Sequence, residues 1–141
     1  MSLGRFREVW CLDFEFRQPD GERPAVRCMV ATEYHTRRTV RLWLEGAAAP
    51  PPFDTGPGAL FVAYLASAEM GCFLALGWSL PVHLLDLYVE FKRLTCGRDG
   101  ETAYPSLAYA LTRLGLAGLD VEEKKRMRDL ATREGPYTDA E

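Results

Sequence analysis

The sequence has no excess of basic residues. Its 141 residues include 17 Lys and Arg against 20 Asp and Glu, so the net charge is −3. Domains that hold nucleic acid through their overall charge are usually basic. The composition argues against that mode of binding, but an enzyme could still hold DNA through metal ions and a local basic patch.

Closely spaced cysteines and long apolar runs are also lacking. The sequence contains no C-x-x-C pair, which argues against a zinc site. No run approaches the roughly 20 apolar residues of a membrane span, so we expect no membrane partner. Because no signal peptide precedes the chain, we expect a cytoplasmic protein with free thiols, most of them in the core. The four cysteines are Cys11, Cys28, Cys72 and Cys96.

What is present suits one globular unit. Hydrophobic residues make up 48% of the chain and charged residues 26%, as in an ordinary globular domain with its own core. No internal repeat or linker divides the sequence. We therefore expect residues 1–141 to form a single domain.

Residues 9–16, Val-Trp-Cys-Leu-Asp-Phe-Glu-Phe, carry the strongest local signal. Six of these eight residues are apolar, which favours a buried strand. Alternation along a strand places Asp13 and Glu15 on one face. Since the apolar residues occur on both faces, we expect the strand to be covered on both sides, as in α/β folds.

The remaining pattern predicts a mixed sheet covered by helices. Two further strands on short turns indicate an antiparallel three-stranded meander. A Pro/Gly/Ala-rich loop over residues 46–58 then leads to strands that alternate with helices. The predicted strands are 25–34, 39–44, 59–64 and a short one at 83–87, and the predicted helices are 66–76, 86–94, 105–114 and 121–133.

Three carboxylates are candidate metal ligands. The Cα atoms of Asp13 and Glu15 would lie roughly 6.6 Å apart, so their side chains could converge on one metal or on a pair about 3.5–4 Å apart. Glu69 falls on one helical face with Cys72 and Phe73, which should point it toward the sheet. Two alternatives remain open. Asp13 and Glu15 could be solvated at the end of the strand, and Glu69 could be a carboxylate that the helix dipole favours in the first turn of its helix.

Two motifs resemble those of the DEDD 3′–5′ exonucleases. Leu12-Asp13-Phe14-Glu15 is similar to their first motif, and the segment from Phe61 to Glu69 is similar to their second. More narrowly, the chain resembles the N-terminal proofreading region of bacterial and phage family A DNA polymerases. This resemblance implies an RNase H-like mixed sheet flanked by helices.

The sequence departs from the family pattern at two places. Leu65 and Ala68 stand where the second motif usually has an Asn and an aromatic residue. The third motif, a Tyr or His followed by an Asp in a late helix, is missing, because Tyr137 and Asp139 are too close together and follow Gly135-Pro136. We therefore expect the fold to be incomplete at its C-terminal end.

The resemblance implies two-metal hydrolysis of phosphodiesters with Mg²⁺ or Mn²⁺. Asp13 would bridge both ions, Glu15 would hold the ion that activates water, and Glu69 would support the second ion. The implied partners are the single-stranded 3′ end of DNA and a polymerase domain. Without the fourth ligand we expect little activity from this chain alone. The alternative is a non-catalytic exonuclease-like module with a DNA-binding or structural role.

Other residues allow two interpretations each. Phe14 and Phe16 could stack on a terminal base or pack in the core. His35 and His83 suit surface or packing positions. The basic residues of the last predicted helix alternate with acids, which is typical of an exposed helix face; they are Lys124, Lys125, Arg126 and Arg128.

Overall fold

The computed structural model describes residues 2–44, 50–97, 104–118 and 120–133. Each predicted strand and helix is present, with ends that differ by at most two residues. None of the described helices is long and apolar enough to cross a membrane. The elements are a 3-10 helix (Leu3–Arg5), strands β1 (Glu8–Arg17), β2 (Ala25–Glu33), β3 (Thr39–Trp43), β4 (Ala59–Ala63) and β5 (Leu84–Asp86), and helices α1 (Ala66–Ala75), α2 (Leu87–Thr95), α3 (Leu107–Arg113) and α4 (Val121–Thr132).

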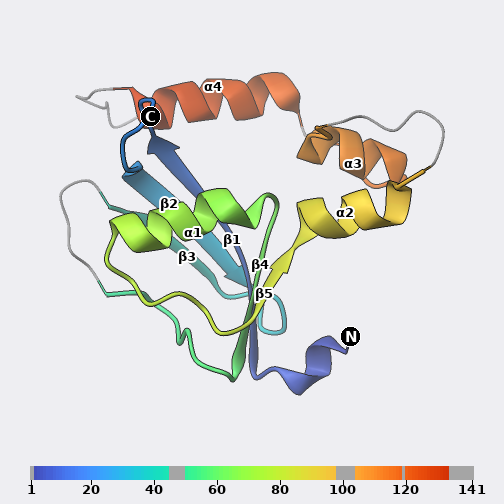
Figure 1. Cartoon of the computed structure of the whole chain (residues 1–141), viewed down its shortest axis with the longest axis horizontal. Helices are drawn as coiled ribbons and strands as arrows, with labels where there is room; N and C mark the ends of the chain where they lie inside the picture. Colours follow the sequence, from blue (N-terminus) through green and yellow to red (C-terminus); the bar gives the residue numbers. More distant parts are fainter. Residues whose placement is uncertain (1, 45–49, 98–103, 119, 134–141) are drawn as a thin grey trace.

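The five strands form one mixed sheet with β1 at its centre (Figure 1). Their order is β3-β2-β1-β4-β5. Strands β1, β2 and β3 are antiparallel neighbours, whereas β4 runs parallel to β1 and β5 runs parallel to β4. The predicted α/β sheet, a three-stranded meander extended by parallel strands, is therefore confirmed.

The main core lies between this sheet and α1. The alternating residues Trp10, Leu12 and Phe14 of β1 are buried there, as period-two patterning requires. Helix α1 contributes Cys72 and Phe73, both fully buried. Aromatic rings fill most of this space, so the helix is fixed over the middle of β1.

The opposite face of β1 differs from its prediction. Val9 is buried in a second, smaller cluster with Phe6 and Leu60, but Cys11 and Asp13 are exposed. Burial on both sides therefore holds only at the start of the strand. Helix α4 contacts β1 further along, but it leaves Asp13 exposed. The expectation of mostly core thiols was wrong: Cys72 is buried and Cys28 partly so, while Cys11 and Cys96 are exposed.

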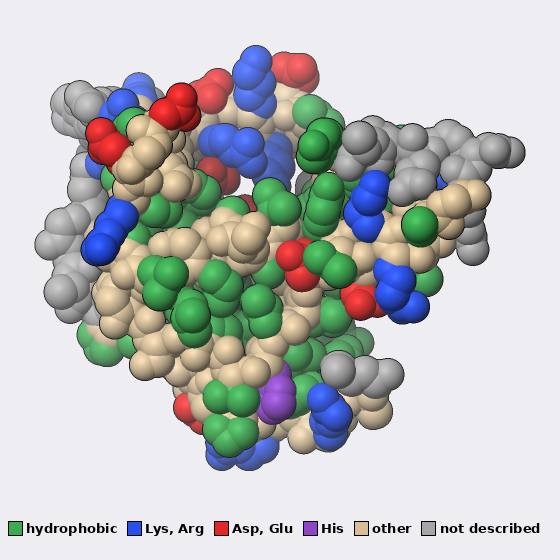
Figure 2. Space-filling model, in the orientation of Figure 1, with side chains coloured by type: hydrophobic (Ala, Val, Ile, Leu, Met, Phe, Trp, Pro, Cys, Tyr) green, Lys and Arg blue, Asp and Glu red, His purple; other side chains and the backbone are tan. Residues whose placement is uncertain are grey.

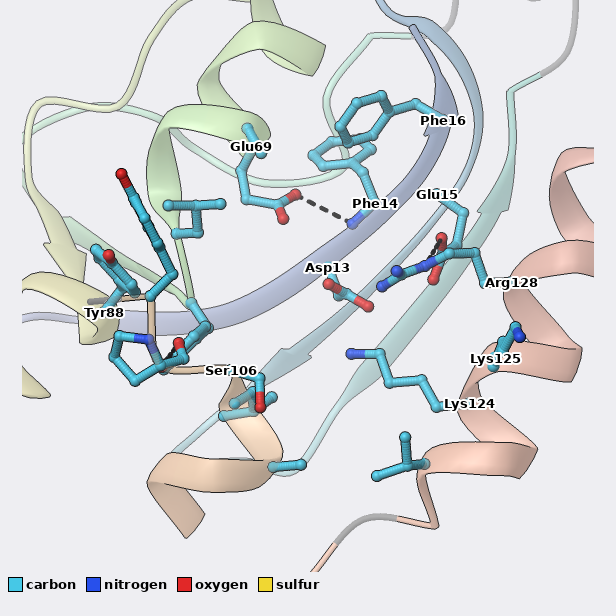
Figure 3. Close-up of a pocket in the computed structure, with 18 residues that line it drawn as sticks. Asp13, Phe14, Glu15, Phe16, Glu69, Tyr88, Ser106, Lys124, Lys125 and Arg128 are labelled. Carbon is cyan, nitrogen blue, oxygen red and sulfur yellow. Dashed lines mark hydrogen bonds and ion pairs between the residues drawn. The ribbon is translucent and has the colours of Figure 1, made fainter. Parts of the chain in front are cut away.

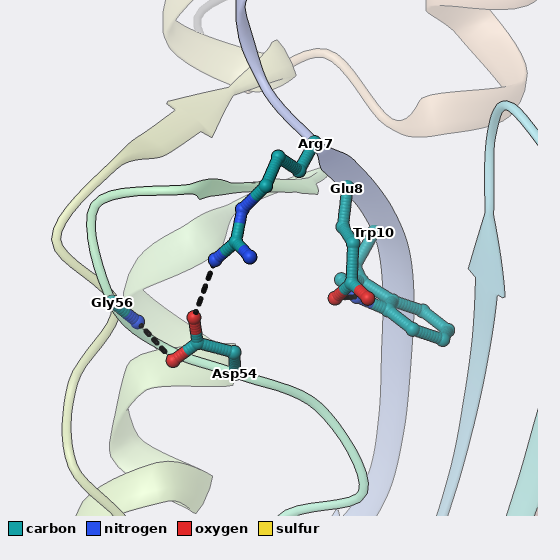
Figure 4. Close-up of polar contacts among 5 residues, drawn as sticks. All are labelled: Arg7, Glu8, Trp10, Asp54 and Gly56. Atoms are coloured by element: carbon teal, nitrogen blue, oxygen red, sulfur yellow. Dashed lines mark hydrogen bonds and ion pairs between the residues drawn. The ribbon is translucent and has the colours of Figure 1, made fainter.

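Polar contacts tie the entry of β1 to the loop before β4 (Figure 4). The guanidinium of Arg7 lies 3.4 Å from the carboxylate of Asp54, which also accepts the backbone N–H of Gly56 at 2.9 Å. The indole N–H of Trp10 donates to Glu8 at 2.9 Å. Of these contacts, the one between Arg7 and Asp54 joins the loop to the start of the strand that carries the two acids.

Glu33, the last residue of β2, is a buried carboxylate that links this strand to β1. It accepts the backbone N–H of Val9 at 3.0 Å and both the N–H and the hydroxyl of Thr36, at 2.6 and 2.7 Å. Burial opposes its charge, but the donated hydrogen bonds outweigh burial and lower its pKa from 4.5 to about 2. The ionised form is therefore the one that the folded protein stabilises.

This lowered pKa predicts a loss of stability in acid. In the unfolded chain the carboxyl titrates near its ordinary pKa of 4.5, so its contribution is complete above about pH 5 and declines as the pH falls toward 2. Urea unfolding should show Glu33→Gln about 2 kcal/mol less stable than wild type at pH 7, with a smaller difference at pH 3. A constant difference across this range would contradict the prediction.

Candidate functional site

One cavity of about 700 Å³ collects all the site residues predicted from sequence. It lies where β1 extends past β4, since the pairing of these strands ends at Cys11 and Val62. Its walls come from β1, the start of α1, the segments around α2 and α3, and α4 (Figure 3). The lining residues are Asp13, Phe14, Glu15, Phe16, Tyr64, Leu65, Ala68, Glu69, Tyr88, Tyr104, Pro105, Ser106, Leu107, Ala108, Val121, Lys124, Lys125 and Arg128.

Asp13 and Glu15 leave the same face of β1 and enter the cavity. Asp13 is exposed and Glu15 is partly buried. Burial raises the pKa of Glu15, the nearby Arg128 opposes that rise, and the charge of Asp13 adds to it. A bulge between Glu15 and Phe16 shifts the register with β2, and the pairing resumes at Phe16 with Val26. The two acids thus lie just before this irregularity, in the part of β1 that extends past its pairing with β4.

Glu69 meets the same strand from α1. Its side chain is only 4% exposed, and its carboxylate accepts the backbone N–H of Phe14 at 3.0 Å. Burial, followed by the charge of Asp13, raises its pKa to about 8. The predicted helical face of Glu69, Cys72 and Phe73 is confirmed, since all three are buried.

The start of α1 has an unusual backbone conformation. Leu65 lies in the left-handed region, with φ 65° and ψ 58°, and provides no side-chain cap. A leucine is disfavoured in this conformation, so the backbone is strained at the residue that precedes the helix. Here Asp86 accepts the N–H of Ala66 at 3.0 Å and also caps α2, so it has a structural role.

Helix α4 brings cations to the acids, which the sequence alone did not indicate. The guanidinium of Arg128 lies 3.3 Å from the carboxylate of Glu15, and the side chain of Lys124 points toward Asp13 (Figure 3). In the space-filling view, Lys and Arg side chains of α4 border a hollow above α1 (Figure 2). The expected exposed helix face is therefore also a wall of the cavity.

The two phenylalanines near the acids differ in burial. Phe14 is 3% exposed, and its ring packs on Phe73 and Trp78 with centroid distances of 5.8 and 6.1 Å. Core packing is thus the role of Phe14, in place of base stacking; Phe16 stays partly exposed. Sequence reasoning missed the tyrosine wall of the cavity, in which the rings of Tyr64 and Tyr88 pack edge to face with centroids 5.8 Å apart.

The donor atoms suit a hard divalent cation by type. Carboxylate oxygens are the ligands that Mg²⁺ and Mn²⁺ prefer. The pKa of Glu69 is raised by burial first and by the neighbouring charge of Asp13 second. Within residues 2–44, 50–97, 104–118 and 120–133, however, no three His, Cys, Asp or Glu side chains are grouped closely enough to hold a metal together. Tyr137 and Asp139 lie outside the described residues.

Comparison with known proteins identifies the fold. No protein-family profile matches the sequence, and no curated protein matches it. Among solved structures, the chain is similar to Escherichia coli RNase D, described as an exoribonuclease involved in structured RNA processing, with a TM-score of 0.56 and 18% identity. The match covers 83% of this chain but only 30% of RNase D. The likeness confirms that this chain has the predicted RNase H-like α/β fold.

Proposed function

We propose that this domain acts on the 3′ end of a nucleic acid strand as a metal-dependent 3′–5′ exonuclease. The single observation that carries the proposal is the meeting of Asp13, Glu15 and Glu69 at one cavity. They come from two elements far apart in sequence, and they belong to the two segments that resemble exonuclease motifs. The fold shared with an exoribonuclease supports the same class of activity.

In this proposal Asp13, Glu15 and Glu69 are the residues that would hold Mg²⁺ or Mn²⁺. The bound ions would supply an activated water and stabilise the leaving 3′ oxygen. The residues of the chain orient the strand: the tyrosine wall gives the terminal base a surface to stack on, and the cations of α4 face the phosphates. Asp13, the exposed acid, is the ligand most open to both ions and substrate.

The proposal has two versions, which differ in whether the substrate is DNA or RNA. The resemblance to polymerase proofreading regions favours a single-stranded DNA end beside a polymerase domain. The likeness to RNase D favours RNA. We propose DNA as the first choice because both sequence motifs resemble the polymerase family.

A second candidate is an exonuclease-like module that binds nucleic acid without cleaving it. The contact between Arg128 and Glu15 favours it, because a cation already occupies one of the proposed ligands. The lack of a three-ligand group in the described part of the chain also favours the non-catalytic module. Binding without cleavage would distinguish this candidate from the enzyme.

Single-stranded DNA and RNA of one sequence, labelled at the 5′ end, test the proposal. We expect slow stepwise shortening of the DNA from its 3′ end with Mg²⁺ or Mn²⁺, since the fourth ligand is missing, and none with EDTA, because hydrolysis needs the ions. A strand blocked by a 3′ phosphorothioate linkage is the matched control for polarity. If either strand binds but is not shortened, the exonuclease is rejected in favour of the non-catalytic module. If RNA is shortened faster than DNA, RNA becomes the first choice of substrate.

A further inference from the structure

Two cations of α4 match two acids of β1 in spacing. Asp13 and Glu15 are two residues apart on a strand and share a face, while Lys124 and Arg128 are four residues apart on a helix and share a face. Arg128 contacts Glu15 at 3.3 Å, and Lys124 points toward Asp13 (Figure 3). The two pairs therefore face each other across the cavity.

The contact between Arg128 and Glu15 can be broken at small cost. Helix α4 has no buried residue, so no core packing fixes it over the acids. The side chains of Arg128 and Glu15 are 56% and 21% exposed, and ion pairs in contact with water add little stability. A stronger ligand for either partner can therefore separate them at small cost.

The charges of the cavity indicate what replaces the contact. Its lining holds three carboxylates, Asp13, Glu15 and Glu69, and three cations, Lys124, Lys125 and Arg128. A divalent ion on the carboxylates would leave the cations without their counter-charges. Phosphate groups restore the balance, and the planar guanidinium of an arginine matches their oxygens in pairs.

We propose that Lys124 and Arg128 are phosphate-binding residues that Asp13 and Glu15 hold until a divalent metal displaces them. This inference rests on the proposed function, because the metal and the strand are the ligands assumed there. In the metal-free protein the cations neutralise the acids. In the loaded protein they contact the phosphates of the strand beside the 3′ end.

One double variant tests this exchange, because it should change the affinity for metal and the affinity for the strand in opposite directions. In the double variant Lys124→Gln/Arg128→Gln we expect Mn²⁺ to bind about tenfold more tightly, because two competing positive charges are removed. A single-stranded oligonucleotide with a terminal phosphorothioate should bind about tenfold more weakly in Mn²⁺, because two phosphate contacts are lost. Calorimetry measures the first affinity and fluorescence anisotropy the second.

The matched control is Arg113→Gln/Arg126→Gln, which removes the same charge away from the cavity lining. It should leave both affinities within about twofold of wild type. The swap Lys124→Arg/Arg128→Lys keeps the charges, so its affinity for Mn²⁺ should match that of wild type. Equal shifts in the control and the double variant, unchanged affinities, or no Mn²⁺ binding by any form would overturn the exchange.

The two proposals can fail separately. Opposite shifts in the two affinities, without any shortening of the strand, would leave the exchange standing and reject the exonuclease. If the strand is shortened with metal but the double variant has the same two affinities as its control, the exonuclease stands and the exchange is rejected.

Discussion

Replacing Asp13 with Asn is expected to lower metal-dependent shortening of a 3′ end by at least about a thousandfold. Asp13 is the exposed carboxylate at the centre of the proposed ligand set, and an uncharged amide cannot take the place of a bridging ligand. Asn has the same size, and the buried neighbours Leu12 and Phe14 are untouched. The folded structure should therefore survive, which urea unfolding would verify.

Asp20→Asn is the matched control. Asp20 is also an exposed aspartate, but it lies in the turn after β1 and does not line the cavity, so this variant should retain the wild-type rate. Calorimetric titration with Mn²⁺ gives a second measurement that does not depend on turnover. If Asp13→Asn binds Mn²⁺ as the wild type does, the assignment of Asp13 as a ligand is wrong.

Phe73→Ala should cause the largest loss of stability, about 3–5 kcal/mol in urea unfolding at pH 7. The ring is fully buried. It meets Trp78 and Phe61 edge to face at 5.4 and 5.9 Å and lies stacked with Phe53 at 6.1 Å. Truncation removes apolar area and aromatic contacts together, and it leaves a cavity that several rigid rings cannot fill.

The neighbouring Leu74 provides a control on the same helix. Its side chain is 62% exposed, so Leu74→Ala should change stability by less than about 0.5 kcal/mol. Similar losses for the two variants would mean that helix propensity, rather than the aromatic cluster, holds α1. A small loss for Phe73→Ala would mean that the rings around it can collapse into the space.

The elements were predictable because each rests on a local pattern. Alternation identified β1, and turn residues separated it from β2. Helical periodicity placed Glu69 toward the sheet, where it is buried beside Phe14. Such patterns depend on neighbours within a few residues, and the sequence displays these directly.

The contacts that complete the site depend on residues far apart in the chain. Arg128 and Glu15 are separated by 113 positions, and no local rule relates them. The tyrosine wall likewise needs the start of α1 and of α2 to lie together. The exposed half of β1 was missed because an apolar strand indicates burial without showing which of its faces a helix will cover.

The hydrogen bond between Glu69 and Phe14 has a consequence for association between molecules. Beyond Cys11, no described strand pairs with β1 on its β4 side, so this stretch of an apolar strand is an edge on which another chain could add a strand. The carboxylate of Glu69 accepts the Phe14 N–H, and an additional strand would have to displace a buried acid. A side chain proposed as a metal ligand thus also occupies a hydrogen-bond donor of this open strand edge.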